Sequence, residues 1–395
     1  MSMNFLAERM KRLGTETAFD VLVKAQALES QGRDIAHMEI GDLGFDTPQN
    51  ICDAAIEAIK DSRNSHYGPA AGYPKLREAI AEYISKTRKI DVKVNEIVVT
   101  PGAKPIMFFG ILACVNEGDE VIYPNPGFPI YESVINFVGA KPVPVPLLEE
   151  VDFRFDIQRL VDSVTPKTKM IIINSPHNPT GGILLKSDLE VIADLAIKNN
   201  IVVMSDEVYS QIIYDDAKHE SIASIPGMKE RTIIIEGFSK TYAMTGWRLG
   251  YGVMPEELAQ HITKLMVNSN SCTAGVIQSA GIEALKGPQE SVGKMVAELK
   301  RRRDVIVDGL NAIEGISCKR PLGAFYVFPN VTKVPMDFMK LPDYLLYEYG
   351  VATLAGTAFG EYGKGYLRLC YAGTMESIMK ALERMDKAIK ALKKG

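Results

Sequence analysis

Short apolar runs recur along the first two thirds of the chain, and segments with the apolar spacing of amphipathic helices separate most of them. Seven runs predict strands, at residues 96–100, 120–123, 141–146, 169–173, 201–204, 232–235 and 249–253. Alternating strands and helices are typical of a largely parallel sheet with both faces covered. The pattern therefore predicts an α/β fold with a mostly parallel seven-stranded sheet. The prolines of run 141–146 indicate an edge strand, since proline cannot donate a ladder hydrogen bond.

The two ends of the chain have a different pattern. The first 31 residues have the spacing of an amphipathic helix, and residues 35–40 alternate like a strand. Beyond Gln278 a long charged helical stretch is followed by short apolar runs at 323–328 and 366–369. We therefore predict a large cofactor-binding domain at 46–285 and a small α+β domain made from 1–45 and 286–395. The basic run Lys300–Arg303 is typical of a solvated helix face.

Composition and charge restrict the function. The chain has 395 residues and a net charge of -4, without the basic excess that nucleic-acid binding requires. No apolar run approaches the roughly 20 residues that span a membrane, and the charged N-terminus does not fit a signal peptide. Five widely spaced cysteines without a CxxC pattern indicate reduced thiols in the cytoplasm. The five histidines do not cluster, so no metal site is expected.

Residues with useful chemistry follow five of the predicted strands. In strand order they are Gly102, Ala103 and Lys104; Phe128; Asn174 and Asn178; Asp206 and Tyr209; Ser239 and Lys240. In open α/β sheets, ligands bind at the carboxyl ends of the strands, so these side chains should share one site. Singly each has an ordinary explanation, such as a helix cap for Asp206. Together they provide an amine, a carboxylate, a phenol, amides, an aromatic face and a helix N-terminus that can bind phosphate.

Pyridoxal phosphate needs each of these groups. A lysine held close to a packed core can lose its proton and attack an aldehyde, which suits Lys240. A carboxylate such as Asp206 keeps the pyridine nitrogen protonated, so that the ring works as an electron sink. The phosphate needs backbone amides, a hydroxyl and an arginine, and here Ser239 can provide the hydroxyl and Arg248 the arginine. We therefore expect pyridoxal 5'-phosphate as the cofactor.

Five motifs resemble those of the pyridoxal-phosphate-dependent aminotransferases of fold type I, class I/II, in the manner of aspartate aminotransferase. They are HYGPAAGYPKLREAI, NSPHNPTGG, SDEVYS, GFSKTYAMTGWRLGY and GYLRLCYA, and the resemblance covers nearly the whole chain. It implies that Lys240 forms the Schiff base and moves the substrate's α-proton, while Asp206 pairs with the pyridine nitrogen. Further cofactor contacts are implied for Gly102, Ala103, Phe128, Asn178, Tyr209, Ser239 and Arg248, and for Lys104 through its backbone.

The same resemblance implies the substrate contacts and the assembly. Arg368 clamps the α-carboxylate of an amino acid, with Gly41, Asn174 and Asn178 beside it. Tyr67 reaches the phosphate of the neighbouring subunit, so a homodimer is expected. Phe128 and Cys370 depart from the commoner pattern, in which an aromatic pair and a serine are frequent; these departures bear on specificity.

The expected reaction moves an α-amino group between an L-amino acid and a 2-oxo acid, with aspartate and 2-oxoglutarate as the best match. Alanine, aromatic and branched-chain substrates stay open, and so does a C–S lyase or another β- or γ-eliminating enzyme of the same fold. A transcription regulator with an aminotransferase-like domain is disfavoured, since no basic DNA-binding segment precedes the pattern. Candidates for a cation that binds a side-chain carboxylate are Lys11, Arg12, Arg33 and Arg63, none of which the sequence places in the site.

Overall fold

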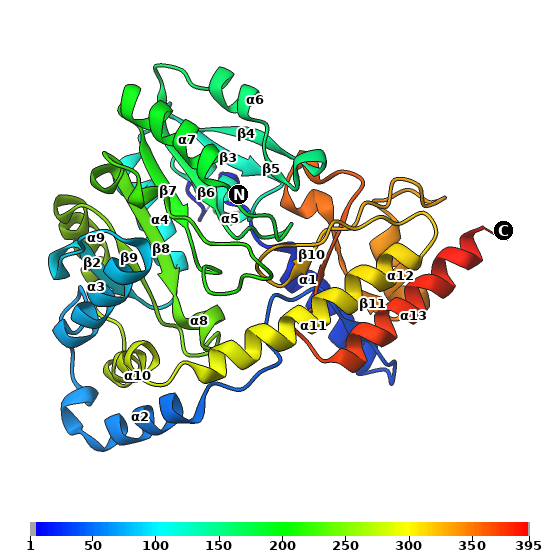
Figure 1. The fold of residues 1–395 in the computed structure, drawn as a ribbon, viewed down its shortest axis with the longest axis horizontal. Coiled ribbons are helices and arrows are strands. Elements are labelled where there is room, and N and C mark those ends of the chain that lie inside the picture. Colours follow the sequence, from blue (N-terminus) through cyan, green and yellow to red (C-terminus); the bar gives the residue numbers. More distant parts are fainter. Residues whose placement is uncertain (1–4, 394–395) are drawn as a thin grey trace.

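The computed structural model describes residues 5–393, and its main feature is a large twisted sheet (Figure 1). The strand order in this central sheet is β2-β9-β8-β7-β6-β3-β4-β5. The strands are β2 (Ile97–Thr100), β3 (Glu120–Asn125), β4 (Lys141–Leu148), β5 (Arg154–Phe155), β6 (Thr168–Asn174), β7 (Val202–Asp206), β8 (Thr232–Gly237) and β9 (Gly250–Val253). The predicted mostly parallel α/β sheet is confirmed, because only β9 and β5 pair antiparallel with their neighbours.

The number of strands differs from the prediction. The sheet has eight strands, because the two-residue strand β5 pairs with the end of β4 at Leu147 and Leu148. A run of two residues is too short to produce a visible period in the sequence. The first six residues of β4 pair only with β3, so its proline-rich part does lie at the edge.

Helices cover both faces of the central sheet, and strand alternation determines which residues meet them. Met170 and Ile172 pack toward α4 (Lys104–Cys114), α5 (Ile130–Phe137) and α9 (Glu256–Ser269). Ile171 and Ile173 point to the other face. That face is covered by α6 (Ile157–Asp162), α7 (Lys186–Lys198), α3 (Pro74–Arg88) and α10 (Gly275–Lys286), with α2 (Gln49–Lys60) against α10.

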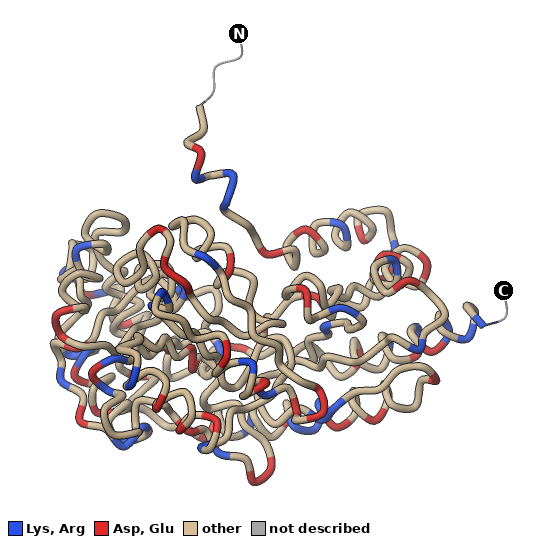
Figure 2. The backbone as a smooth tube through the Cα atoms, turned by 90° about the horizontal axis from the view of Figure 1, so that it is seen from above, with Lys and Arg blue, Asp and Glu red and all other residues tan. Residues whose placement is uncertain are grey.

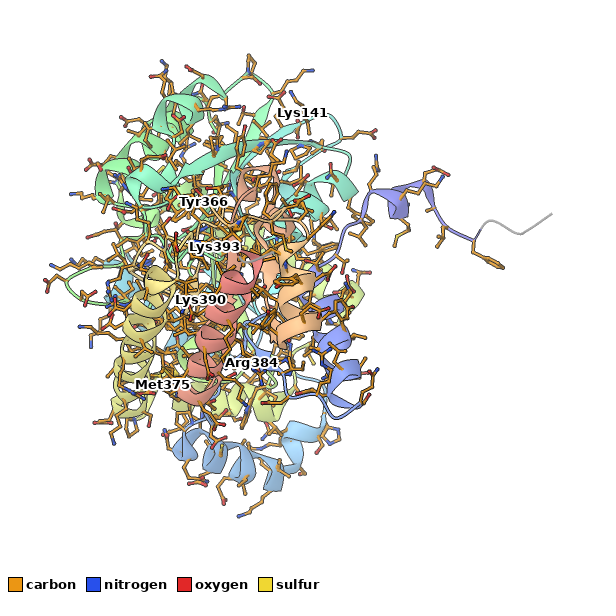
Figure 3. The ribbon with its side chains drawn as sticks, turned by 90° about the vertical axis from the view of Figure 1, so that its right-hand side faces the viewer. Lys141, Tyr366, Met375, Arg384, Lys390 and Lys393 are labelled. Atoms are coloured by element: carbon orange, nitrogen blue, oxygen red, sulfur yellow. The ribbon has the colours of Figure 1, made fainter. Side chains whose placement is uncertain are left out.

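Segments from both ends of the chain form a second packed region beside the sheet (Figure 1). Strand β1 (Ala36–His37) pairs with β11 (Val351–Ala352), and a three-stranded sheet has the order β10-β13-β12. Its strands are β10 (Tyr326–Val327), β12 (Leu354–Ala355) and β13 (Leu367–Cys370). Helices α11 (Glu290–Ala312), α12 (Leu341–Tyr349) and α13 (Met375–Leu392) complete this region. Figure 3 shows α13 along the surface, with Met375 and Lys390 near its two ends. The predicted domain boundaries at residues 46 and 285 stay a prediction.

The basic run on α11 is a solvated face only in part: Lys300 and Arg301 are exposed as predicted, but Arg302 and Arg303 are buried. The Arg303 side chain is almost fully buried, pairs with Asp215 and Asp304, and lies 4.8 Å from the ring centre of Tyr214. Arg302 is also buried and donates to the carbonyl oxygens of residues 372 and 373. The acidic partner Asp215 comes from a distant loop, which the local charge pattern could not indicate.

The N-terminal helical prediction is right only in part. The segment before helix α1 (Thr17–Glu29) contains a short 3-10 helix at Glu8–Arg12 and projects from the body (Figure 2). On α1 only Ala25 and Leu28 are buried, while Phe19 and Val23 are exposed. In the described part of the chain, no helix is long and apolar enough to cross a membrane.

Candidate active site

A cavity of about 590 Å³ opens at the carboxyl edge of the central sheet. It forms there because β6, β7 and β8 end side by side, and the chain then turns away from the sheet in each case. Its walls include twelve of the predicted site residues: Gly41, Ala103, Lys104, Phe128, Asn174, Asn178, Asp206, Tyr209, Ser239, Lys240, Arg248 and Arg368. Gly102 lies directly behind this wall, and Tyr67 does not line the cavity.

Lys240 enters the cavity from the short helix α8 (Phe238–Thr241), which directly follows β8. Its Nζ donates to the carbonyl oxygen of Gly41 at 2.7 Å and lies 5.5 Å from the ring centre of Phe325. Burial lowers the pKa of Lys240 to about 8, because the charged form loses hydration. Near pH 7 the amine is therefore neutral far more often than that of an ordinary lysine, as a nucleophile toward an aldehyde requires.

Asp206 is the last residue of β7 and faces the cavity. Its Oδ2 accepts a hydrogen bond from the hydroxyl of Tyr131 at 2.6 Å. Burial raises the pKa of Asp206 to about 6, and the Tyr131 hydrogen bond opposes that shift. A buried carboxylate of this kind is a suitable partner for a protonated ring nitrogen.

Asn174 and Asn178 are held by a local hydrogen-bond pattern after β6. The side chain of Asn174 donates to the Asp206 carbonyl oxygen at 2.9 Å and accepts from the Asn178 backbone at 2.9 Å. The hydroxyl of Tyr209 lies 3.0 Å from that of Tyr326. These contacts fix an amide and a phenol on one wall of the cavity.

One end of the cavity is suited to an anion. Helix α4 starts at Lys104, so the backbone N–H groups of Ala103 and Lys104 have no acceptor within the helix. Gly102 has φ +86°, and a Cβ there would lie 2.2 Å from Nη2 of Arg248. The missing side chain leaves room for the guanidinium beside the helix start, and Ser239 adds a hydroxyl. Together these groups match a phosphate.

Arg368 approaches from β13, in the second packed region. Its Cζ lies 4.7 Å from the ring centre of Tyr326 and 5.0 Å from that of Phe359, so two aromatic faces hold the guanidinium. One Nη donates to the Glu39 carbonyl oxygen, and the other lies 3.5 Å from Oδ1 of Asn178. Its buried Nε has no hydrogen-bond partner. A buried donor without an acceptor fits a group that awaits a carboxylate.

Lys104 provides more than its backbone. Its Nζ forms an ion pair with Glu16 and lies 5.4 Å from the ring centre of Phe128, and all three residues line the cavity. The sequence-based interpretation gave Lys104 a backbone contact only. Of the four cations proposed to bind a side-chain carboxylate, none lines this cavity, and Arg12 lines a neighbouring one.

Among the cavity residues that were not predicted, Glu16, Tyr131 and Tyr326 contact predicted site residues through their side chains. Tyr131 lies on α5 three residues after Phe128, and Tyr326 lies on β10 in an apolar run that looks like an ordinary core strand. Their roles follow from contacts with distant residues, so no local sequence signal identifies them. Tyr67, by contrast, is 89% exposed.

The donor set fits pyridoxal phosphate. A lysine with a lowered pKa, a buried carboxylate and a phosphate-sized anion site line one cavity, and an arginine with a free buried donor reaches it from the other side. When bound, this cofactor would act as an electron sink for the α-carbon of an amino acid.

Comparison with known proteins identifies the class. The family model for aminotransferase class I and II matches residues 33–385, and the chain belongs to this family. It is 43% identical to an aspartate aminotransferase of Pyrococcus abyssi, over 91% of this chain and 93% of the relative. The enzyme is therefore a pyridoxal-phosphate-dependent aminotransferase, as the motifs predicted.

Two solved structures have the same fold. An aromatic aminotransferase of Pyrococcus horikoshii superposes with a TM-score of 0.89 at 42% identity, covering 94% of this chain and 99% of that one. An aspartate aminotransferase of Thermus thermophilus, solved with maleate, gives a TM-score of 0.92 at 35% identity, covering 98% and 100%. Relatives with different substrates are therefore similarly close in structure.

Proposed function

We propose that this aminotransferase transfers the amino group of L-aspartate to 2-oxoglutarate, and that Lys240 is the amine to which the cofactor aldehyde binds. The cations of the cavity carry the proposal. Among residues 5–393, the lysine and arginine side chains that line it are Lys104, Lys240, Arg248 and Arg368. Lys240, Arg248 and Arg368 have roles that every aminotransferase needs, which are attachment of the cofactor, phosphate binding and α-carboxylate binding, respectively. Lys104 is left to bind the second carboxylate of a dicarboxylic substrate.

The chain's own residues perform the remaining steps. Arg368 holds the α-carboxylate through donors in one plane, and Asn178 supports it. As a free amine, Lys240 would be a base of suitable pKa to move the proton of the α-carbon. Asp206 would keep the ring nitrogen of the cofactor protonated, and Tyr209 would donate to its phenolate oxygen. Phe128, which lines the same cavity, would cover one face of the ring.

Aromatic amino acids are the second candidate. Glu16 already neutralises Lys104, and Phe19, Met107 and Phe128 give the same cavity apolar surface. A dicarboxylic substrate must therefore compete with Glu16 for Lys104, whereas an aromatic side chain could lie over the paired charges. The aromatic aminotransferase of Pyrococcus horikoshii, at 42% identity, supports this alternative.

Half-reactions with single amino acids separate the candidates. Stopped-flow absorbance would follow conversion of the bound cofactor by aspartate, glutamate, phenylalanine and alanine, in the native enzyme and in Lys104→Met. If Lys104 binds the second carboxylate, the change lowers kcat/KM for aspartate roughly 10- to 100-fold, the value of a charged hydrogen bond, and spares phenylalanine. Lys141→Met is the matched control, since Lys141 pairs with Glu120 on the surface, away from the cavity (Figure 3).

The outcomes are distinct. Fast conversion by phenylalanine with little effect of Lys104→Met would replace aspartate with an aromatic substrate. Release of pyruvate and ammonia from cystathionine, without any oxo-acid acceptor, would instead establish an eliminating enzyme. Normal turnover by Lys240→Ala would overturn the assignment of the lysine.

We also propose a cytoplasmic homodimer in which Tyr67 contacts the phosphate held by the neighbouring subunit. Tyr67 is 89% exposed, and Ile56 and Ile59 on the adjacent helix α2 are exposed as well, which suits an interface. Mixing Lys240→Ala and Tyr67→Ala chains tests the proposal. If Tyr67 acts across the interface, half of the sites in each hybrid dimer regain both residues and activity returns. If it acts within its own chain, mixing restores nothing.

A further inference from the structure

We propose that Tyr326 is a positioning residue that connects the α-carboxylate clamp at Arg368 to the hydrogen bond that Tyr209 makes with the cofactor. The inference rests on the proposed function of the site. Tyr326 is 2% exposed and lies on β10, in register with Cys370 of β13, two residues from Arg368. Its ring and its hydroxyl contact different parts of the site.

The ring of Tyr326 forms one side of the arginine clamp. The guanidinium carbon of Arg368 lies 4.7 Å from its centre, and Phe359 holds the opposite side at 5.0 Å. A desolvated guanidinium between two aromatic faces keeps its plane fixed, which two-pronged binding of a carboxylate requires. A ring without a hydroxyl would serve equally well in this position.

The hydroxyl of Tyr326 has a second role. It lies 3.0 Å from the hydroxyl of Tyr209, in a region where both phenols are buried. A phenol has one proton to donate. When Tyr209 donates to the phenolate oxygen of the cofactor, Tyr326 must be the donor of the bond between the two phenols. Donation to Tyr209 polarises its O–H group and strengthens the bond that it makes in turn.

The surroundings of Tyr326 favour this direction. Burial raises the pKa of Tyr326, and the positive charge of Arg368 opposes the shift, so Arg368 promotes proton donation. The other titratable groups that face it are Tyr209, Cys370 and Glu16. The hydroxyl also packs against Gly41, where a Cβ would lie 2.1 Å from it, and the Gly41 carbonyl oxygen accepts from Lys240. Tyr326 thus contacts Arg368, Tyr209 and the backbone that holds Lys240.

Two variants of the cofactor-loaded enzyme separate ring from hydroxyl. Tyr326→Phe keeps the ring and removes the hydroxyl, whereas Tyr326→Leu removes both. One readout is the pH midpoint of the cofactor's visible absorption. The other is the Kd of two carboxylates without an amino group, maleate and 3-phenylpropionate, measured by the same absorption.

Both variants should raise the pH midpoint by a few tenths of a unit. A weaker hydrogen bond from Tyr209 leaves more negative charge on the phenolate oxygen of the cofactor, and this charge holds the titrating proton of the cofactor more firmly. Only Tyr326→Leu should raise the Kd of the tighter-binding probe, by about 3- to 30-fold, the range of a buried cation–π contact. Tyr371→Phe is the control: it removes an equally buried hydroxyl of the same region, bonded to Tyr214 and the Ala324 carbonyl oxygen, and should change neither readout.

Other patterns would overturn the proposal. An unchanged midpoint in Tyr326→Phe would show that the hydroxyl does not act through Tyr209. An equal rise of Kd in both variants would show that the ring is not the part that holds Arg368. The proposed function fails on different results, measured with the native enzyme, Lys104→Met and Lys240→Ala, so failure of one proposal can be told from failure of the other.

Discussion

Replacing Arg88 with methionine should destabilise the fold in a way that depends on pH. Arg88 is buried at the end of α3, and its guanidinium donates to Glu207 at 2.8 Å and to Glu236 at 2.6 Å. Glu207 directly follows Asp206, and Glu236 precedes Lys240 by four residues. The arginine therefore joins the two strands that carry the central groups of the site. Removing one partner from a buried ion pair costs about 3–5 kcal/mol.

The sign of the pH dependence follows from Glu236. Burial raises its pKa from 4.5 to about 7, while Arg88 opposes that rise. A carboxyl with a raised pKa in the folded state contributes stability below its unfolded pKa, and the contribution is lost as the pH rises through the folded pKa. The native protein therefore loses this contribution between pH 4.5 and about 7. Without Arg88 the pKa moves higher and the loss continues, by about 1.4 kcal/mol per pH unit above 7.

Urea unfolding of the cofactor-free protein at pH 6, 7 and 8 measures this effect. The stability difference between native and Arg88→Met protein should grow with pH, and adding Glu236→Gln should restore much of the loss at pH 8. Arg77→Met is the control, because Arg77 lies on the same helix but donates only to backbone carbonyl oxygens. A difference that stays constant or shrinks as pH rises would refute the charge assignment of this cluster.

Three further predictions concern the cofactor site. Tyr131→Phe removes the hydrogen bond that holds down the pKa of Asp206, so this pKa should rise above about 6 and cofactor affinity should fall roughly 10-fold, measured by equilibrium dialysis. Gly102→Ala places a Cβ 2.2 Å from Nη2 of Arg248 at φ +86°, so it should also weaken cofactor binding. In cofactor-free protein, acylation of Lys240 followed by mass spectrometry should rise with a midpoint near pH 8 instead of 10.5.

The first two of these predictions have matched control variants. Tyr123→Phe removes a similar tyrosine–carboxylate bond, to Glu132, outside the main cavity, and should leave cofactor affinity unchanged. Gly118→Ala has φ +84° but no atom within 4 Å of the new Cβ, so it isolates backbone strain from the clash. Equal losses in variant and control would contradict the first two predictions. A Lys240 midpoint near 10.5 would show that burial does not lower its pKa.

The sequence was sufficient for most of the sheet and for the part of the cavity wall that follows the strand ends, for a physical reason. Parallel strands need regular crossovers, so their apolar runs repeat visibly, and residues just after their carboxyl ends converge without any further information. Asn174, Asp206 and Lys240 were placed together on this basis. Arg368 and Gly41 come from the second packed region, and their positions beside the sheet depended on the motif resemblance.

Other features depend on packing between distant segments. The sequence around Tyr326 is that of a buried strand, and nothing local tells that its hydroxyl meets Tyr209. For Arg303 the sequence suggested exposure where the structure shows burial. Its basic neighbours are typical of a solvated helix face, but Asp215 and the ring of Tyr214 bury it. An arginine can be buried wherever the fold brings it a carboxylate and an aromatic face, and here Asp215 and Tyr214 are both far from Arg303 in sequence.

The adjacent acids Asp206 and Glu207 show how one strand end serves two purposes. Side chains alternate along a strand, so Asp206 faces the cavity while Ser205 and Glu207 face away from it. Glu207 there accepts from Arg88, Ser205, Ser221 and His219. Burial alone would raise the pKa of Glu207, but His219, Arg88 and Ser221 together hold it well below its usual value. Glu207 therefore stays ionised one residue from Asp206, and its charge is among the causes that raise the Asp206 pKa. The buried cluster behind the strand thus adjusts the carboxylate in front of it, which is why a change at Arg88 should reach the cofactor site as well as the stability of the fold.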